Sequence, residues 1–310
     1  MRAHTKAPFP ILSSVLILIS YLLGACSASA AGPQPAQSVS PALSPTIAVV
    51  AAENFYGDIV RQLGAGRVTV VSILSDPNVD PHEYESSVQN AVAVTRAQLV
   101  VENGSGYDAW MDKLLSASPN AQRIVLVAAD IADHKLSDNP HFWYSLDNIQ
   151  TIAQSMTTAL EKLDGSHSID YQAALARFRS SLAPIQQKII DLKSKYAGTP
   201  VGLTETIFLY QTGPIGLSVL TPFEFQKAVA EGNDPPANAV LVANDQITSH
   251  AIKVLIYNVQ TVTPLTSNLQ EQARQHNIPI VPVSETMPAG KTYQSWMQDQ
   301  LIELEKALGG

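Results

Sequence analysis

Two short motifs in this 310-residue chain present a histidine directly after a proline. They are Asp-Pro-His-Glu-Tyr at residues 80–84 and Asp-Asn-Pro-His-Phe-Trp at residues 138–143. Proline restricts its own φ and pushes the preceding residue toward extended geometry, so we expect both imidazoles on stiff loops. A stiff loop loses little conformational entropy when its side chain binds a ligand. The pattern makes His82 and His141 candidate metal ligands, although a histidine after a proline is more commonly an ordinary loop residue.

Two glutamates in the second half of the chain follow segments that are rich in β-branched and apolar residues. Glu205 comes directly after a predicted strand at 199–204, and Glu285 comes after another at 278–283. Parallel sheets bind ligands at the carboxyl ends of their strands, where both glutamates would lie. Taken singly, each glutamate is more simply a solvated residue at the end of a strand.

The first half of the chain alternates between strand-like and helix-like segments. The predicted strands are 46–51, 68–74, 98–101 and 123–127. The predicted helices are 53–63, 86–97, 107–115 and 145–163. Such alternation predicts a parallel sheet with helices on both faces.

Residues 169–196 carry the most regular helical pattern in the sequence. Their apolar residues alternate spacings of four and three, as in Tyr171, Leu175, Phe178, Leu182, Ile185, Ile189, Leu192 and Tyr196. We expect a long helix that lies across both halves of the protein, with a kink at Pro184, because an interior proline costs roughly 3 kcal/mol. A coiled coil is the alternative, but the run is short and lacks a repeated charged flank.

The alternation resumes after the long helix, with predicted strands at 199–204, 253–257 and 278–283 and a predicted helix at 222–230. Residues 238–250 could be a strand by their Val-Leu-Val run, but the preceding Asp-Pro-Pro is typical of a helix start, so we expect a helix. The predicted fold class is α/β, with two βα lobes, each a mainly parallel sheet flanked by helices, joined by one long linker helix. The predicted limits are 46–168 for the N-terminal lobe, 169–197 for the linker helix and 198–310 for the C-terminal lobe.

The N-terminus has the features of a bacterial lipoprotein signal peptide. Arg2 and Lys6 precede an apolar stretch at 8–23, and Leu-Gly-Ala-Cys ends at Cys26. We expect residues 1–26 to be a signal that leaves a lipidated Cys26, and the Pro-, Ser- and Ala-rich residues 27–45 to be a flexible tether. An ordinary cleaved signal is the alternative. The expected location is extracytoplasmic, either lipid-anchored on the outer face of the cell membrane or periplasmic.

Composition narrows the range of partners. The chain has 27 acidic and 19 basic residues, a net charge of −8, and Cys26 is its only cysteine. An acidic chain without a basic cluster argues against nucleic-acid binding and is compatible with a cationic ligand. A single cysteine excludes an internal disulfide and a multi-thiolate metal site. We expect a monomer.

Four segments together resemble the metal-specific, zinc or manganese, solute-binding proteins of ABC importers, over about residues 46–308. They are Asp-Pro-His-Glu-Tyr-Glu at 80–85, Asn-Pro-His-Phe-Trp at 139–143, Glu-Thr-Ile-Phe-Leu-Tyr at 205–210, and Glu285 ahead of Tyr-Gln-Ser-Trp-Met at 293–297. The resemblance implies that His82, His141, Glu205 and Glu285 bind one divalent metal between two lobes. It also implies delivery of the metal to a membrane permease. Two features depart from the family pattern: Glu285 stands where Asp is usual, and a His-rich loop is missing.

The ligand types favour Mn²⁺ over Zn²⁺, because two carboxylates make a harder site than additional imidazoles would. Glu53, Asn103 and Asp108 lie near predicted strand ends and are candidates for orienting a ligand. His250 and His276 are expected to be surface residues. Two other functions remain open at this stage: a zinc-dependent metallohydrolase with the same ligands, and a surface adhesin.

Overall fold

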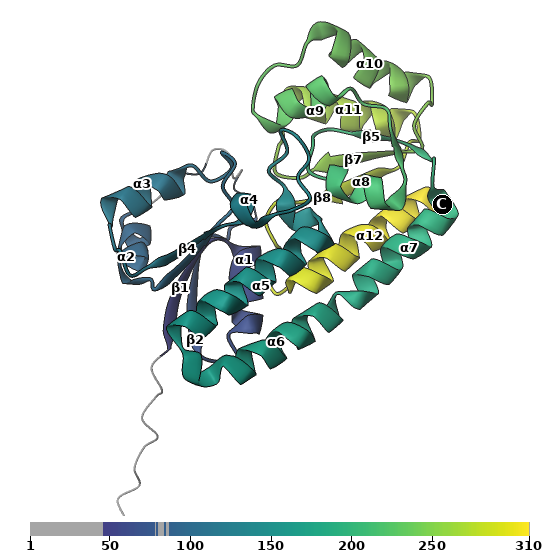
Figure 1. Cartoon of the computed structure of the whole chain (residues 1–310). Helices are drawn as coiled ribbons and strands as arrows, with labels where there is room; N and C mark the ends of the chain where they lie inside the picture. The colour runs from purple at the N-terminus through teal and green to yellow at the C-terminus, as the bar shows by residue number, and fades with distance from the viewer. Residues whose placement is uncertain (1–45, 78, 80–83, 85–86, 310) are drawn as a thin grey trace, which may run out of the picture. The chain divides into compact units, whose positions relative to one another are not determined.

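Two parallel β-sheets flanked by helices form the structure, a computed structural model that describes residues 46–77, 79, 84 and 87–309 (Figure 1). The strand order is β2-β1-β3-β4 in the first sheet and β6-β5-β7-β8 in the second. Every strand pair is parallel. The predicted α/β fold class with two βα lobes is confirmed.

The N-terminal lobe alternates strands with helices, as the sequence predicts. Its elements are β1 (Ile47–Glu53), α1 (Asn54–Leu63), β2 (Val68–Leu74), α2 (Val88–Arg96), β3 (Leu99–Glu102), α3 (Trp110–Ala117), β4 (Ile124–Val127), α4 (Ala128–Ile131), the 3₁₀ turn η2 (Phe142–Tyr144), α5 (Leu146–Leu163) and the 3₁₀ turn η3 (Gly165–His167). The β-branched runs of β1 and β3 are almost fully buried, which is typical of strands covered on both faces.

The C-terminal lobe repeats the same strand order with shorter elements. They are β5 (Pro200–Leu203), α8 (Leu209–Ile215), β6 (Ser218–Val219), α9 (Phe223–Ala230), α10 (Ala237–Thr248), β7 (Val254–Asn258), α11 (Pro264–Gln275), β8 (Ile280–Val283) and α12 (Tyr293–Gly309). The predicted strands agree with the observed ones to within two residues at each end, and residues 238–250 are helical, as expected. The sequence analysis missed β6, α8, α11 and α12.

The expected long linker helix is present as a bent helix, and its two parts meet at Leu182, two residues before the kink expected at Pro184. Helix α6 (Ser168–Ser181) ends before Leu182, and α7 (Ala183–Tyr196) begins after it. Pro184 lies in the first turn of α7, where its missing N–H breaks no helical hydrogen bond. The two helices follow one another as a long bent rod (Figure 1).

The two halves of the bent rod pack against different lobes. Helix α6 packs against α1 and α5, whereas α7 packs against α8 and α12. One buried apolar cluster contains residues of both sheets, among them Val49, Val101, Val201 and Ile256. Separating the lobes would therefore expose apolar surface, which opposes wide opening. No helix in the described part of the chain is both long and apolar enough to cross a bilayer.

Candidate metal site

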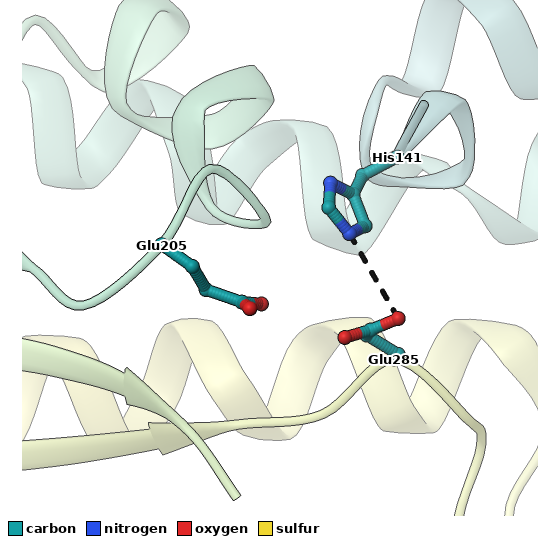
Figure 2. Close-up of side chains that lie close together, drawn as sticks. All are labelled: His141, Glu205 and Glu285. Atoms are coloured by element: carbon teal, nitrogen blue, oxygen red, sulfur yellow. Dashed lines mark ion pairs between the residues drawn. The ribbon is translucent and has the colours of Figure 1, made fainter. Parts of the chain in front are cut away.

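Three buried side chains converge from separate loops: His141, Glu205 and Glu285 (Figure 2). One potential ligand atom from each lies within 4.8 Å of the others, and all three residues are at most 1% exposed. His141 Nε2 lies 3.9 Å from Glu285 Oε2. An imidazole and two carboxylates buried this closely form a ligand set that a divalent cation can bind and neutralise.

The sheet order of the C-terminal lobe brings the two glutamates together. Glu205 lies just past β5 and Glu285 just past β8, and these strands flank β7 in the sheet. Because the strands are parallel, their carboxyl ends meet at one edge, where the loops carry both carboxylates. His141 reaches the same point from the N-terminal lobe, at the start of η2.

Asn139 orients the His141 imidazole. Its Oδ1 accepts the backbone N–H of His141 at 3.1 Å and lies 2.8 Å from His141 Nδ1. Its Nδ2 donates to the Thr206 carbonyl at 2.8 Å, which identifies the other atom of the amide as the oxygen. Nδ1 must then carry the proton, so in the neutral ring the Nε2 lone pair faces Glu285. This is the tautomer that a metal ligand requires.

Aromatic rings pack against the histidine, and one of them, Tyr107, also lies beside Glu285. The Trp143 ring lies 5.2 Å from the His141 ring in an edge arrangement and stacks on Phe55 at 4.5 Å. Tyr107 lies 6.0 Å from the His141 ring. Burial, followed by the Glu285 charge, raises the pKa of Tyr107 well above its usual value, so this phenol stays neutral.

Two amides that the sequence analysis missed hold the acidic loops. Asn258 Nδ2 donates to Oε1 of both Glu205 and Glu285. Gln260 Oε1 accepts the backbone N–H groups of Glu285 and Thr286, at 2.7 and 3.0 Å. Gln260 Nε2 donates to the carbonyl of Val79, three residues before His82, at 2.9 Å. In the sequence, the only sign of these two amides is that they follow the predicted strand at 253–257. The sheet order is needed to show that they lie beside the acids.

Asn103, Asp108 and Glu53, which were expected to orient a ligand, lie behind the loop that carries His141 and are not in the His141 group itself. Asn103 Nδ2 donates to the carbonyl of Pro140, directly before His141, at 2.9 Å. Asp108 accepts the backbone N–H groups of Asn103 and Gly104, at 2.6 and 2.8 Å. Glu53 is fully buried, and burial and the Asp108 charge raise its pKa well above the usual value. Asn103 therefore supports the His141 loop directly. Asp108 holds the backbone of Asn103, and Glu53 interacts with Asp108.

We expect Glu53→Gln to stabilise the metal-free protein at neutral pH. The raised pKa means that the native protein keeps a proton on Glu53 that the unfolded chain loses above about pH 4.3. Wild-type stability therefore falls with rising pH in this window, by up to about 1.4 kcal/mol per pH unit, and glutamine removes the loss. Chemical denaturation from pH 4 to 8 measures the difference. A gain at pH 7 that persists unchanged at pH 4, or a gain also given by exposed Glu224→Gln, would contradict this explanation.

The remaining predicted positions have separate outcomes. His82, and Cys26 with the rest of residues 1–45, lie outside the described residues. His250 is exposed, as expected, and its ring packs against that of His276 at a centroid distance of 5.4 Å. Neither histidine belongs to the His141 group.

Comparison with known proteins identifies relatives of this chain. It is 24% identical over 203 residues to the manganese ABC transporter substrate-binding lipoprotein scaA of Streptococcus gordonii, covering 60% of this chain and 61% of that protein. The chain spans about half to three fifths of the length of the curated relatives it matches.

Two solved structures share the fold. The periplasmic zinc-binding protein TroA of Treponema pallidum superimposes with a TM-score of 0.71 at 15% identity, covering 86% of this chain and 99% of that one. The Mn²⁺ complex of the solute-binding protein FpvC of Pseudomonas aeruginosa gives 0.70 at 17% identity, covering 85% and 98%. The sequence profile of the ZnuA family, described as zinc-uptake complex component A, periplasmic, matches residues 49–307, so this chain belongs to that family.

Proposed function

We propose that this protein captures a divalent transition metal, Mn²⁺ or Zn²⁺, outside the cytoplasm and delivers it to the permease of an ABC importer. The observation that carries the proposal is the buried convergence of His141, Glu205 and Glu285. His82 is the proposed fourth ligand, from the loop whose Val79 carbonyl Gln260 binds. Two nitrogen and two oxygen ligands suit both metals.

The metal is cargo rather than a catalyst in this proposal. The relatives named above are a transporter component and metal-binding proteins, which supports transport over the hydrolase and adhesin alternatives. A cavity of about 250 Å³ is lined in part by Pro140 and Thr206, which are next to His141 and Glu205 in the chain, and we propose that the metal enters from this side. The cation would bridge residues of both lobes and so favour the arrangement that a permease recognises.

The proposal includes the placement of the protein. Residues 1–26 act as a lipoprotein signal, Cys26 carries lipid, and 27–45 tether a monomeric body to the membrane. We propose lobe limits of 46–168 and 198–310, with the bent helical linker between them.

Metal analysis of protein purified without chelator tests the function, followed by competitive titration with Mn²⁺ and Zn²⁺. We expect one metal ion per chain and no detectable hydrolase activity. His82→Ala and His141→Ala should each lose most of the affinity, while His250→Ala serves as an unaffected control. A wild-type chain that binds neither metal would refute the proposal.

We expect Glu205→His to shift the metal preference further toward zinc. An added imidazole in place of a carboxylate softens the site, and zinc already stands above manganese in the affinity order of divalent metals. The ratio of the two dissociation constants, measured by competition in the same buffer, reports the shift. An unaltered ratio would show that ligand hardness does not set the preference here.

A further inference from the structure

Asn258 occupies a position that the sheet order makes special. It is the last residue of β7, and β7 lies between β5 and β8. The register pairs Leu203 with Ile256 and Asn258 with Val283, so Glu205 and Glu285 follow on either side of Asn258. Its side chain is 1% exposed and is enclosed with both acids.

The amide of Asn258 binds one oxygen of each acid. Nδ2 donates to Glu205 Oε1 at 2.8 Å and to Glu285 Oε1 at 2.5 Å. Oδ1 accepts the backbone N–H of Gln260 at 3.0 Å. A backbone N–H can only donate, so this contact identifies the oxygen and directs the NH₂ group toward the acids.

The NH₂ group of Asn258 has no hydrogen left for a further acceptor. It carries two hydrogens, and its third neighbour is Thr261 Oγ1, at 2.9 Å. Three acceptors thus share two hydrogens. A donor placed between two carboxylates lowers the cost of holding both in a buried site, and it restricts how each can rotate.

We propose that Asn258 is a positioning residue that engages Oε1 of Glu205 and of Glu285, so that each acid presents a single oxygen to the cation. This inference rests on the proposed function. Glu285 Oε2, the oxygen that Asn258 does not bind, is the one that lies 3.9 Å from His141 Nε2 (Figure 2). One oxygen from each acid limits the protein to four ligand atoms with the two proposed histidines.

The limit on ligand number bears on metal choice. Zinc in proteins is commonly four-coordinate and tetrahedral, whereas manganese favours six ligands that are mostly oxygen. Bidentate binding by both carboxylates would supply two further oxygens. The two carboxylates are hard ligands and favour manganese. Asn258 opposes this preference, because it holds the coordination number at four, which favours zinc.

The test compares wild type with Asn258→Ala by competitive titration of Zn²⁺ and Mn²⁺ and by X-ray absorption at the zinc edge. Loss of a group that orients metal ligands costs about 10- to 100-fold in affinity. We expect that loss for zinc, a smaller loss for manganese, and more oxygen neighbours around zinc in the variant. Asn258→Ser retains one hydroxyl donor, should give an intermediate ratio, and carries the same test if the alanine variant does not fold.

Equal losses for both metals with an unchanged number of zinc neighbours would overturn the positioning role, because they would indicate a general structural effect. Asn244→Ala removes an asparagine that bonds to the Val240 carbonyl on α10 and should leave the metal ratio unchanged. Failure of the proposed function is distinguishable, because wild type itself would then bind neither metal.

Discussion

Saturating metal is expected to raise the melting temperature of the wild-type protein by roughly 8 to 16 °C, and Glu285→Gln is expected to abolish most of that rise. A ligand that binds only the native state stabilises it by about 4 kcal/mol at a thousandfold excess over its Kd. A body of this size gains roughly 2 to 4 °C per kcal/mol. Glu285 is 0% exposed and lies within the His141 group, so glutamine removes the charge of a proposed ligand with little change of shape.

Calorimetry with and without Mn²⁺ or Zn²⁺ measures this shift. His141→Ala should also lose most of the metal-induced rise. Glu224→Gln, which changes an exposed acid on α9, should keep the full rise. The metal-free Glu285→Gln protein should melt no lower than wild type, because it buries one carboxylate fewer beside Glu205. A full metal-induced rise in Glu285→Gln would remove Glu285 from the ligand set.

Trp143→Ala is expected to cost about 3 to 5 kcal/mol of unfolding free energy in the metal-free protein. Trp143 is fully buried, stacks on Phe55 and lies against the His141 ring. Its backbone carbonyl accepts the hydroxyl of Tyr293, from the C-terminal helix α12, at 2.7 Å. The substitution leaves a large cavity at the base of the His141 loop, so metal affinity should fall with stability.

Urea denaturation of the metal-free variant gives the free energy, and metal titration gives the affinity. Trp143→Phe is the matched variant, and it should lose clearly less, since it keeps an aromatic ring on Phe55. It also removes an indole N–H that has no acceptor in the described part of the chain. A loss below about 1 kcal/mol in Trp143→Ala would show that the site tolerates a cavity here, contrary to the expected cost of truncating a buried tryptophan.

Local pattern was enough to predict most of the strands, many of the helices and the candidate ligands. The β-branched runs that form β1, β2 and β7 and the periodicity of residues 169–196 are properties of consecutive residues. They predicted the two βα lobes. The prolines before His82 and His141 indicated that both histidines are candidate metal ligands. The kink expected at Pro184 is found as a break at Leu182, because the proline lies in the first turn of a second helix instead of inside one continuous helix. The pattern of apolar residues continues through Leu182 and does not reveal this break.

Strand order and the contacts between loops could come only from the tertiary structure. No local pattern states that β7 lies between β5 and β8, so the sequence does not reveal that Asn258 joins two acids that are 80 residues apart in the chain. Likewise, the Thr206 carbonyl, from the other lobe, helps to orient the Asn139 amide that selects the His141 tautomer. Sequence determines which side chains are able to bind a metal, because that depends on residue type. The fold decides which oxygens and which nitrogen face one another, because hydrogen bonds between distant segments set those orientations.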